Sequence, residues 1–419
     1  MSEWREVALG DLIEVFDHKR IPLSSAQRST RQGSFPYYGA QGVIDYIDDF
    51  IFDGRFILIP EDGENLRSRK LPIAYFAEGR FWVNNHAHIV RARSGVAVDR
   101  FVQAALQASD IGAYVTGAAQ PKLSQANLRQ IPVRLPSLEE QHVIAIILDA
   151  LDDLIDNNRR RMGLLEQMVE AIYREWFVCF RYPGQESTEV IDSSLGPIPE
   201  GWKIGNVAEL ASAERNAVTG GPFGSRLGRK DYVDTGVPVL RGGNLRVGGG
   251  FDECELVYVS DDKADELRSS LARRGDVVVT QRGTLGQVGL IPAGSLFDRY
   301  LLSQSQMKIT LDPARATAEF VYAQLRTKET TDRFIAQAMS SGVPHVNLAL
   351  LRAFELVVPP IELQHQFSEA IAGPTATAWL VREENRRLAA IRDLLLPKLV
   401  SGEIDVSNLD LDALVGSAG

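Results

Sequence analysis

"PKLSQANLRQIPVRLPSLEEQH", residues 121–142, and "PHVNLALLRAFELVVPPIELQH", residues 344–365, are closely similar. The second stretch follows the first at a constant offset of 223 residues, so that Gln141 and Gln364 stand at the same place in each. Self-similarity of this kind marks a structural unit that the chain builds more than once. We therefore expect two equivalent halves.

The repeat extends beyond these two stretches. "EWREVALGDLIEV" from Glu3 is echoed by "EGWKIGNVAELAS" from Glu200, each with a Trp followed by a strand-like and then a helix-like run. Downstream, "NNRRRMGLLEQM" from Asn157 is echoed by "ENRRLAAIRDLL" from Glu384. A period near 200 residues is far longer than the ~20–50 residues of a solenoid unit. The order predicted is globular domain, helix, globular domain, helix.

The segments after the repeated stretches carry apolar residues at spacings of three and four, each interrupted by an asparagine. Apolar a and d positions, with one buried Asn that fixes the register, are typical of coiled-coil helices. The alternative is an amphipathic helix on the surface of each globular domain. The residues expected between the two helices are Ile147, Leu151, Leu154, Asn158, Leu165, Val381, Asn385, Leu388 and Leu395.

The two helices are expected to differ in continuity. Residues 139–176 are predicted to form one helix, about 57 Å long at 1.5 Å per residue. The second segment contains "AGPTATAW", where Gly373 and Pro374 are expected to break the helix, because proline lacks the N–H and its ring clashes with the preceding turn. The second long helix is therefore predicted from about Thr375 to Leu399.

Length and composition indicate a multi-domain globular protein. The 419 residues allow two or three domains. We expect no membrane partner, since no apolar run approaches ~20 residues, and a cytoplasmic location, since residues 1–11 lack an export signal. Cys179 and Cys254 are the two cysteines and lie far apart, so neither a disulfide nor a zinc site is expected.

The net charge of −10 is unevenly distributed. Residues 136–199 carry a net charge of −7 and residues 359–419 carry −4, whereas residues 1–135 and 200–358 carry +1 and 0. An acidic protein is an unusual partner for nucleic acid. Here, however, the acidity lies in the helical segments, so each globular domain is free to have one basic face.

Motifs for catalysis are missing from the sequence. We find no GxxxxGK[ST] phosphate loop, GxGxxG after a strand, GxSxG elbow or HExxH. His86 and His88 in "NNHAH" have a spacing that metal sites use, but no third ligand is nearby, so hydrogen-bonded structural histidines are favoured. We expect a binding protein without metal or cofactor of its own.

Several stretches are similar to those of specificity subunits of type I restriction-modification systems, and the resemblance covers almost the full chain. One variety of the recognition domain is resembled by "GGPFGSRLGRKDYVDTGVPVLRGGNL" from Gly220, "RGDVVVTQRGTLGQVGLIP" from Arg274 and "SGVPHVNLALLRAFELVVPPIELQ" from Ser341. A second variety is resembled by "FPYYGAQGVIDYIDDFIFDG" from Phe35, "WVNNHAHIVRA" from Trp82 and "TGAAQPKLSQANLRQIPV" from Thr116.

The resemblance implies a mixed α/β fold with a pseudo-twofold internal repeat: two target recognition domains separated by two long antiparallel coiled-coil helices. Each domain would read one half of a bipartite site on double-stranded DNA, and the helices would set the spacer and dock two methyltransferase subunits. Methylation and cleavage would belong to those subunits and to restriction/translocase subunits, which would hold S-adenosylmethionine, ATP and Mg. The alternatives are a related modification or phage-defence system, a fused methyltransferase, or a coiled-coil scaffold that reads no DNA.

The predicted boundaries follow the repeat. The expected segments are a first recognition domain over 1–135, a central helix over 136–180, a linker over 181–200, a second recognition domain over 201–358, a C-terminal helix over 359–402 and a tail over 403–419. Within the domains we predict strands at "RFILIP", "RFWVNN", "DVVVTQR" and "MKITL", and helices at "DRFVQAALQAS" and "EFVYAQLRTK".

Candidate DNA contacts are Arg, Lys, Asn, Gln and His side chains in loops, because the first four pair with base edges and phosphates. His345 enters by register, since Pro344-His345 corresponds to Pro121-Lys122. The alternative for each is a solvated surface side chain. The candidates are Arg67, Arg69, Lys70, Gln120 and Lys122 in the first domain, and Arg226, Arg229, Lys230, Arg241, Asn244, Arg282 and His345 in the second.

Overall fold

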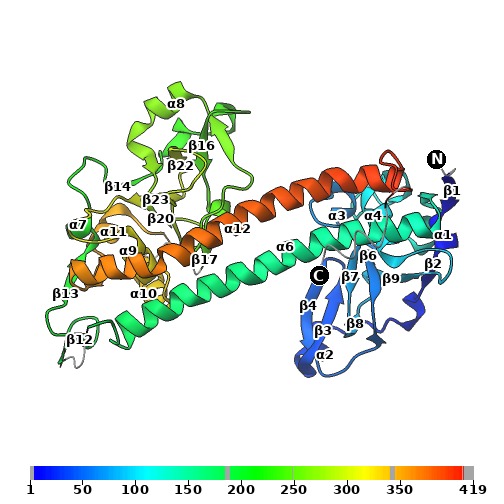
Figure 1. Cartoon of the computed structure of the whole chain (residues 1–419), viewed down its shortest axis with the longest axis horizontal. Helices are drawn as coiled ribbons and strands as arrows, with labels where there is room; N and C mark the ends of the chain where they lie inside the picture. The colour runs from blue at the N-terminus through cyan, green and yellow to red at the C-terminus, as the bar shows by residue number, and fades with distance from the viewer. Residues whose placement is uncertain (1–3, 185–188, 248, 340–344, 408, 410–419) are drawn as a thin grey trace. The chain divides into compact units, whose positions relative to one another are not determined.

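The computed structural model describes residues 4–184, 189–247, 249–339, 345–407 and 409. The chain forms two compact units, one of Met1–Arg159 with Glu383–Gly419 and one of Arg160–Arg382. Both boundaries fall inside the long helices α6 (Leu138–Tyr173) and α12 (Ile361–Ser401) (Figure 1). Each unit therefore contains one globular domain and one half of each helix, a grouping that the sequence did not predict.

The first unit is built from two four-stranded sheets. One has the order β2 (Ile13–Val15), β9 (Ala87–Ala92), β6 (Phe56–Pro60), β7 (Tyr75–Ala77), and the other β4 (Gly42–Ile47), β3 (Gln32–Gly39), β8 (Arg80–Val83), β5 (Phe52–Asp53). Strands β3 and β8 are parallel. The unit also contains α4 (Asp99–Ala108), α5 (Gln125–Gln130), and β1 (Arg5–Ala8) paired with β10 (Pro132–Leu135).

The second unit repeats this topology. Its first sheet has the order β14 (Val218–Gly220), β23 (Gln306–Ile309), β20 (Val277–Thr280), β21 (Gln287–Leu290), β17 (Arg246–Val247), and its second the order β15 (Tyr232–Val233), β18 (Val257–Val259), β16 (Val237–Leu240), β22 (Arg299–Leu302), β19 (Leu271–Arg273). Strands β16 and β22 are parallel, as β3 and β8 are. Helices α9 (Ala318–Leu325), α10 (Lys328–Met339) and α11 (Leu348–Ala353) follow, and β13 (Lys203–Asn206) pairs with β24 (Glu355–Val358).

The mixed α/β fold and the predicted elements are confirmed. The stretches "RFILIP", "RFWVNN" and "DVVVTQR" contain β6, β8 and β20, and "MKITL" contains all of β23 except its first residue. Their apolar runs are buried on both faces, since all five residues of β6 and all four of β20 are buried. The two predicted helices are α4 and α9. In the described part of the chain, no helix is both long and apolar enough to cross a membrane.

The repeated stretch has the same structural role in both units. The Gln141 side chain accepts a hydrogen bond from the Val98 backbone N–H (3.0 Å) and donates one to the Pro136 carbonyl (3.1 Å). Gln364 makes the equivalent bonds to the Thr317 N–H (3.0 Å) and the Pro359 carbonyl (2.9 Å). Both glutamines are buried, so each ties the start of a long helix to the domain before it. The equivalence of Pro344 with Pro121 lies outside the described residues.

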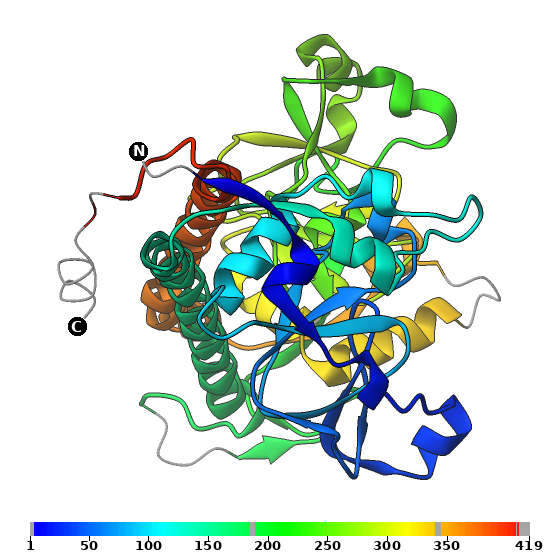
Figure 2. The same cartoon turned by 90° about the vertical axis from the view of Figure 1, so that its right-hand side faces the viewer.

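Helices α6 and α12 pair in an antiparallel manner within each unit. In the first unit they lie side by side in both views (Figures 1 and 2). Arg392 contacts Asp152 (2.9 Å), and the Asn385 Nδ2 donates to the Ile155 carbonyl (3.0 Å). Residue numbers therefore increase along α6 where those of the contacting residues decrease along α12. The Asn158 Nδ2 donates to Glu384 Oε2 (3.2 Å). Asn158 and Asn385 are both buried, as predicted for polar positions between paired helices.

The predicted break at Gly373 and Pro374 is wrong, because α12 is one helix from Ile361 to Ser401. Proline removes one hydrogen bond, to the carbonyl of Ala370, but Ala370 is exposed and water can satisfy that carbonyl. The repeat offset also rises from 223 to 227 between Gln364 and Glu384, so four residues have been added. Four residues are about one helical turn, which a continuous helix absorbs.

The predicted placement of Leu154 between the helices is also wrong. Leu154 is 51% exposed, whereas its neighbour Ile155 is 2% exposed. Ile147 is half-buried, and Leu148 beside it is fully buried. Two apolar residues stand next to each other at both places, so spacings of three and four fit either residue of each pair. In the structure the second residue of each pair, Leu148 or Ile155, is the buried one. Of the remaining positions, Val381 is buried, and Leu151, Leu165, Leu388 and Leu395 are half-buried.

This difference gives a stability prediction. Ile155→Ala is expected to lower the free energy of unfolding by about 2–4 kcal/mol, because it leaves a cavity between packed side chains. Leu154→Ala removes the same kind of apolar group from an exposed site and is expected to cost under about 1 kcal/mol. Chemical denaturation of the two variants measures the difference, and equal losses would restore Leu154 to the helix pair.

Candidate nucleic-acid interface

In each unit, hydrogen bonds bring four loops together, and we refer to these as the loop cluster of that unit. In the first unit the loops are residues 16–20, 61–64, 84–86 and 116–123; in the second they are residues 221–226, 281–286, 303–305 and 345–347. The Leu123 N–H donates to the Glu61 carbonyl (2.8 Å), as the Val346 N–H does to the Gln281 carbonyl (3.0 Å). The two clusters are therefore held by equivalent backbone bonds but differ in their side chains.

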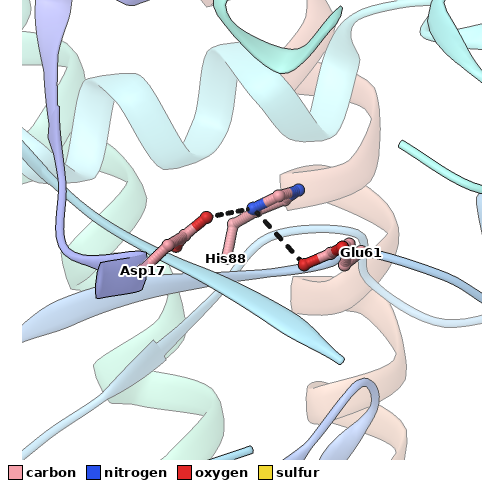
Figure 3. A group of neighbouring side chains, drawn as sticks. All are labelled: Asp17, Glu61 and His88. Atoms are coloured by element: carbon pink, nitrogen blue, oxygen red, sulfur yellow. Dashed lines mark hydrogen bonds and ion pairs between the residues drawn. The ribbon is translucent and has the colours of Figure 1, made fainter. Parts of the chain in front are cut away.

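The first loop cluster is held by an ionic network, of which Figure 3 shows Asp17, Glu61 and His88. His88 on β9 is 1% exposed, its Nδ1 lies 2.6 Å from Asp17 Oδ2, and its Nε2 lies 2.8 Å from the Leu123 carbonyl. The Glu61 carboxylate binds Arg20 (2.8 Å) and Lys122 (3.2 Å). Arg20 also donates to the Asn85 carbonyl (3.4 Å), so side chains of the network reach all four loops and fix the segment that carries Lys122.

Asp17, Glu61 and His88 are close enough together to suggest a metal site, because one ligand atom of each lies within 4.8 Å of the others. The hydrogen bonds argue for a different role. The two ring nitrogens of His88 face the Asp17 carboxylate and the Leu123 carbonyl, so both are engaged in hydrogen bonds within the protein. His86 is exposed and bonds Asp62 (2.7 Å). Both histidines are hydrogen-bonded, as expected, and the expectation that they hold no metal stays a prediction.

The network shifts the pKa of both carboxylates. Burial alone raises the pKa of Asp17, but the hydrogen bond and the charge of His88 outweigh burial and hold the pKa below its usual value. Burial also raises the pKa of Glu61, and the hydrogen bond from Arg20 with the charge of His88 lowers it overall.

A pH dependence of stability follows from these shifts. Carboxylates whose pKa is lower in the folded state stabilise the fold above their unfolded pKa, about 4 for Asp and Glu. That stabilisation is lost as the pH falls through the folded pKa. We expect the free energy of unfolding to fall below about pH 4, and less steeply in Asp17→Asn. Denaturant titrations between pH 7 and pH 2 measure both slopes; parallel curves would remove Asp17 as a contributor.

The second loop cluster is held by neutral amides instead of charges. The Gln281 Nε2 donates to the Gln304 carbonyl, and the Gln304 Nε2 donates to the Gly224 carbonyl (2.6 Å). The Gln281 N–H donates to the Ser305 carbonyl (2.8 Å), the counterpart of the bond from the Glu61 N–H to the His86 carbonyl (2.9 Å). The same backbone frame thus carries a different set of side chains in each unit.

The structure brings the predicted residues of the first domain together. Arg67 is exposed and donates to the carbonyls of Gly117 and Ala118, in the loop that also carries Gln120 and Lys122. Arg69 has a left-handed backbone (φ 49°) and donates to the carbonyls of Gln107 and Ser109 at the end of α4, so it supports the fold. Lys70 and Gln120 are exposed. As DNA contacts these residues stay predictions.

The predicted residues of the second domain separate into two groups. Arg226 and Arg282 lie in the loop cluster and His345 at its edge, while Arg229 and Lys230 follow directly in an exposed turn. Asn244, however, is 2% exposed, and its Nδ2 donates to the carbonyls of Asp252 and Cys254. The prediction of Asn244 as a DNA contact is therefore wrong, because its amide closes a turn inside the protein. Arg241 bonds the Glu255 carbonyl (2.5 Å) and stays a prediction.

The sequence did not identify several residues of the loop clusters as candidates for the site. Asp17, Arg20 and Glu61 carry no motif, and their roles arise only when distant loops meet. Phe223 was also missed, although an aromatic residue inside the basic, glycine-rich stretch "GGPFGSRLGRK" is a signal that could have been used.

Both the sequence and the structure of this chain are similar to those of known proteins. The family model described as "Type I restriction modification DNA specificity domain" matches residues 1–167 and again 199–373. A Haemophilus influenzae protein assigned as a type I restriction enzyme specificity subunit is 26% identical over 68% of this chain and 66% of its own length. The MjaVIII specificity subunit of Methanocaldococcus jannaschii is 20% identical over 98% of this chain and 95% of its own. The S subunit of a type I restriction-modification system from M. genitalium has the same fold, with a TM-score of 0.60 at 16% identity over 95% of this chain and 96% of that one.

Proposed function

Because the chain belongs to the family of type I restriction modification DNA specificity domains and carries that domain twice, we propose that each domain reads one half of a bipartite, asymmetric DNA site. One observation carries this proposal: both units present a loop cluster with the same backbone bonds and different side chains. Equivalent backbone structures in the two loop clusters are consistent with the binding of two half-sites on one duplex. Because side chains read the base edges, different side chains are expected to recognise different half-site sequences.

The proposal assigns recognition to this chain and chemistry to its partners. The family is one of DNA recognition. We propose that α6 and α12 set the spacer between the half-sites and dock two methyltransferase subunits, with restriction/translocase subunits completing the complex. S-adenosylmethionine, ATP and Mg would be bound by those partners, in the cytoplasm. The acidic charge of residues 136–199 and 359–419 would keep DNA away from the helices and on the domains.

The test is co-expression with a candidate methyltransferase subunit, followed by genome-wide mapping of methylated adenine. A single motif with two unlike halves around a fixed, unspecified spacer is expected. A stable complex that methylates no defined motif would contradict DNA reading and support a scaffold role for the helices. Transfer of a methyl group by the purified chain alone would instead make the chain an enzyme.

A further inference from the structure

Phe223 is an exposed aromatic residue in the second loop cluster. Its side chain is 58% exposed, in a loop between the buried Pro222 and Gly224. A single exposed apolar residue is ordinary on a protein surface. Phe223 differs from that ordinary case in how firmly it is held and in what surrounds it.

The backbone on both sides of Phe223 is anchored. The Gly221 N–H donates to the Gln306 carbonyl (2.9 Å), and a Cβ at Gly221 would lie 1.9 Å from the Ser303 oxygen, so only glycine allows this approach. On the other side, the Gln304 side chain holds the Gly224 carbonyl. The ring is thus presented to solvent from a fixed loop, and binding would lose little conformational entropy by ordering it.

The surroundings of the ring are positively charged. The Arg282 guanidinium lies over the Phe223 ring, 6.0 Å from its centroid. Residues 220–230 contain three basic and no acidic side chains. Among the described residues, no carboxylate forms an ion pair with Arg226 or Arg282. An apolar ring among uncompensated cations suits a polyanion with apolar groups, which describes DNA bases and phosphates.

The corresponding loop of the first unit holds its aromatic ring differently. Phe16 stands in the corresponding loop after β2, and its ring packs edge-on against Phe56 with centroids 5.3 Å apart. Phe16 is partly buried against the core there. The aromatic ring of this loop is therefore partly buried in the first unit and exposed in the second.

We propose that Phe223 is a specificity-determining residue that contacts a thymine methyl group in the major groove of the half-site read by the second unit. The C5-methyl of thymine is an apolar group among the hydrogen-bonding groups of the major-groove edge, and phenylalanine is among the side chains that recognise it. Arg282 beside the ring is placed to bond a neighbouring guanine. This inference rests on the proposed function and adds the chemical group that is read.

The experiment uses the complex with its methyltransferase subunit and duplexes of the mapped site in which each thymine in turn is replaced by uracil, which lacks only the methyl group. Wild-type complex is expected to lose about fourfold in affinity at one thymine of one half-site, the effect of about one apolar carbon. Phe223→Ala is expected to bind the thymine duplex at least tenfold more weakly and to bind the thymine and uracil duplexes equally.

Leu296→Ala is the matched control, since Leu296 is 52% exposed in the same unit outside the loop cluster, and it should retain the fourfold discrimination. The proposal is overturned if Phe223→Ala discriminates thymine from uracil as wild type does, or if the half-site contains no thymine. A wild-type complex without any preferred site would overturn the proposed function itself, which is a different result.

Discussion

Replacing Arg226, Arg229 and Lys230 together by alanine is expected to lower the affinity for the target DNA about 100-fold near 0.15 M salt. All three are exposed, and no carboxylate of the described residues forms an ion pair with Arg226 or Lys230 or with Arg229. Each cation that neutralises a phosphate contributes about −0.9 to the slope of log affinity against log salt concentration. Three lost contacts should therefore flatten the slope by roughly 2 to 3.

A control with the same change in charge is available in the same unit. Arg273, Arg299 and Lys328 are equally basic but bind Glu214 (2.6 Å), Asp261 (2.6 Å) and Asp332 (2.5 Å) respectively. Their triple alanine variant is expected to keep most of the affinity and the wild-type salt slope. If both triple variants lose affinity equally, net charge alone explains binding and the loop after β14 has no special role. Fluorescence anisotropy at several salt concentrations measures both quantities.

His88→Ala is expected to lower the free energy of unfolding by about 3 kcal/mol. Removing one partner of a buried ion pair leaves the other charge uncompensated, which costs about 3–5 kcal/mol. The lower end applies here because Arg20 still lies 3.5 Å from the Asp17 carboxylate. The variant also removes the bond to the Leu123 carbonyl, so the loop that carries Gln120 and Lys122 should become more mobile.

His86→Ala is the matched control, two residues before His88 in the chain. His86 is exposed and its pair with Asp62 lies at the surface, where an ion pair contributes about 0–1 kcal/mol. Chemical denaturation compares the two variants, and hydrogen exchange measures the loop. A loss below about 1 kcal/mol for His88→Ala would show that the network does not stabilise the first unit.

The duplicated organisation could be predicted because the sequence patterns that indicate it lie in short segments of the chain. The register of Gln141 with Gln364, the strand-like runs and the heptad spacing all depend on residues close together in the chain, and period and propensity act over such distances. The basic stretch at Arg226 was visible for the same reason. The resemblance to type I specificity subunits rested on the order of these signals.

The heptad face and the loop clusters could not be predicted in the same way. Ile155 and Leu154 are equivalent as a pattern, and only packing against α12 distinguishes them. Asn244 has the side chain of a base-reading residue, yet its amide is used by the carbonyls of Asp252 and Cys254, ten or fewer residues away in the chain.

By itself the sequence determined that this protein is a duplicated pair of α/β domains and long helices, with acidic helical segments and basic loops. Only the tertiary structure decided which residues those loops present. Asp17, Glu61, His88 and Lys122 are distant in sequence and become one network because β-strand pairing and loop closure bring them within hydrogen-bonding distance. Hydrogen bonds and burial depend on the distances between side chains in space, and for residues far apart in the chain these distances are set by the tertiary structure.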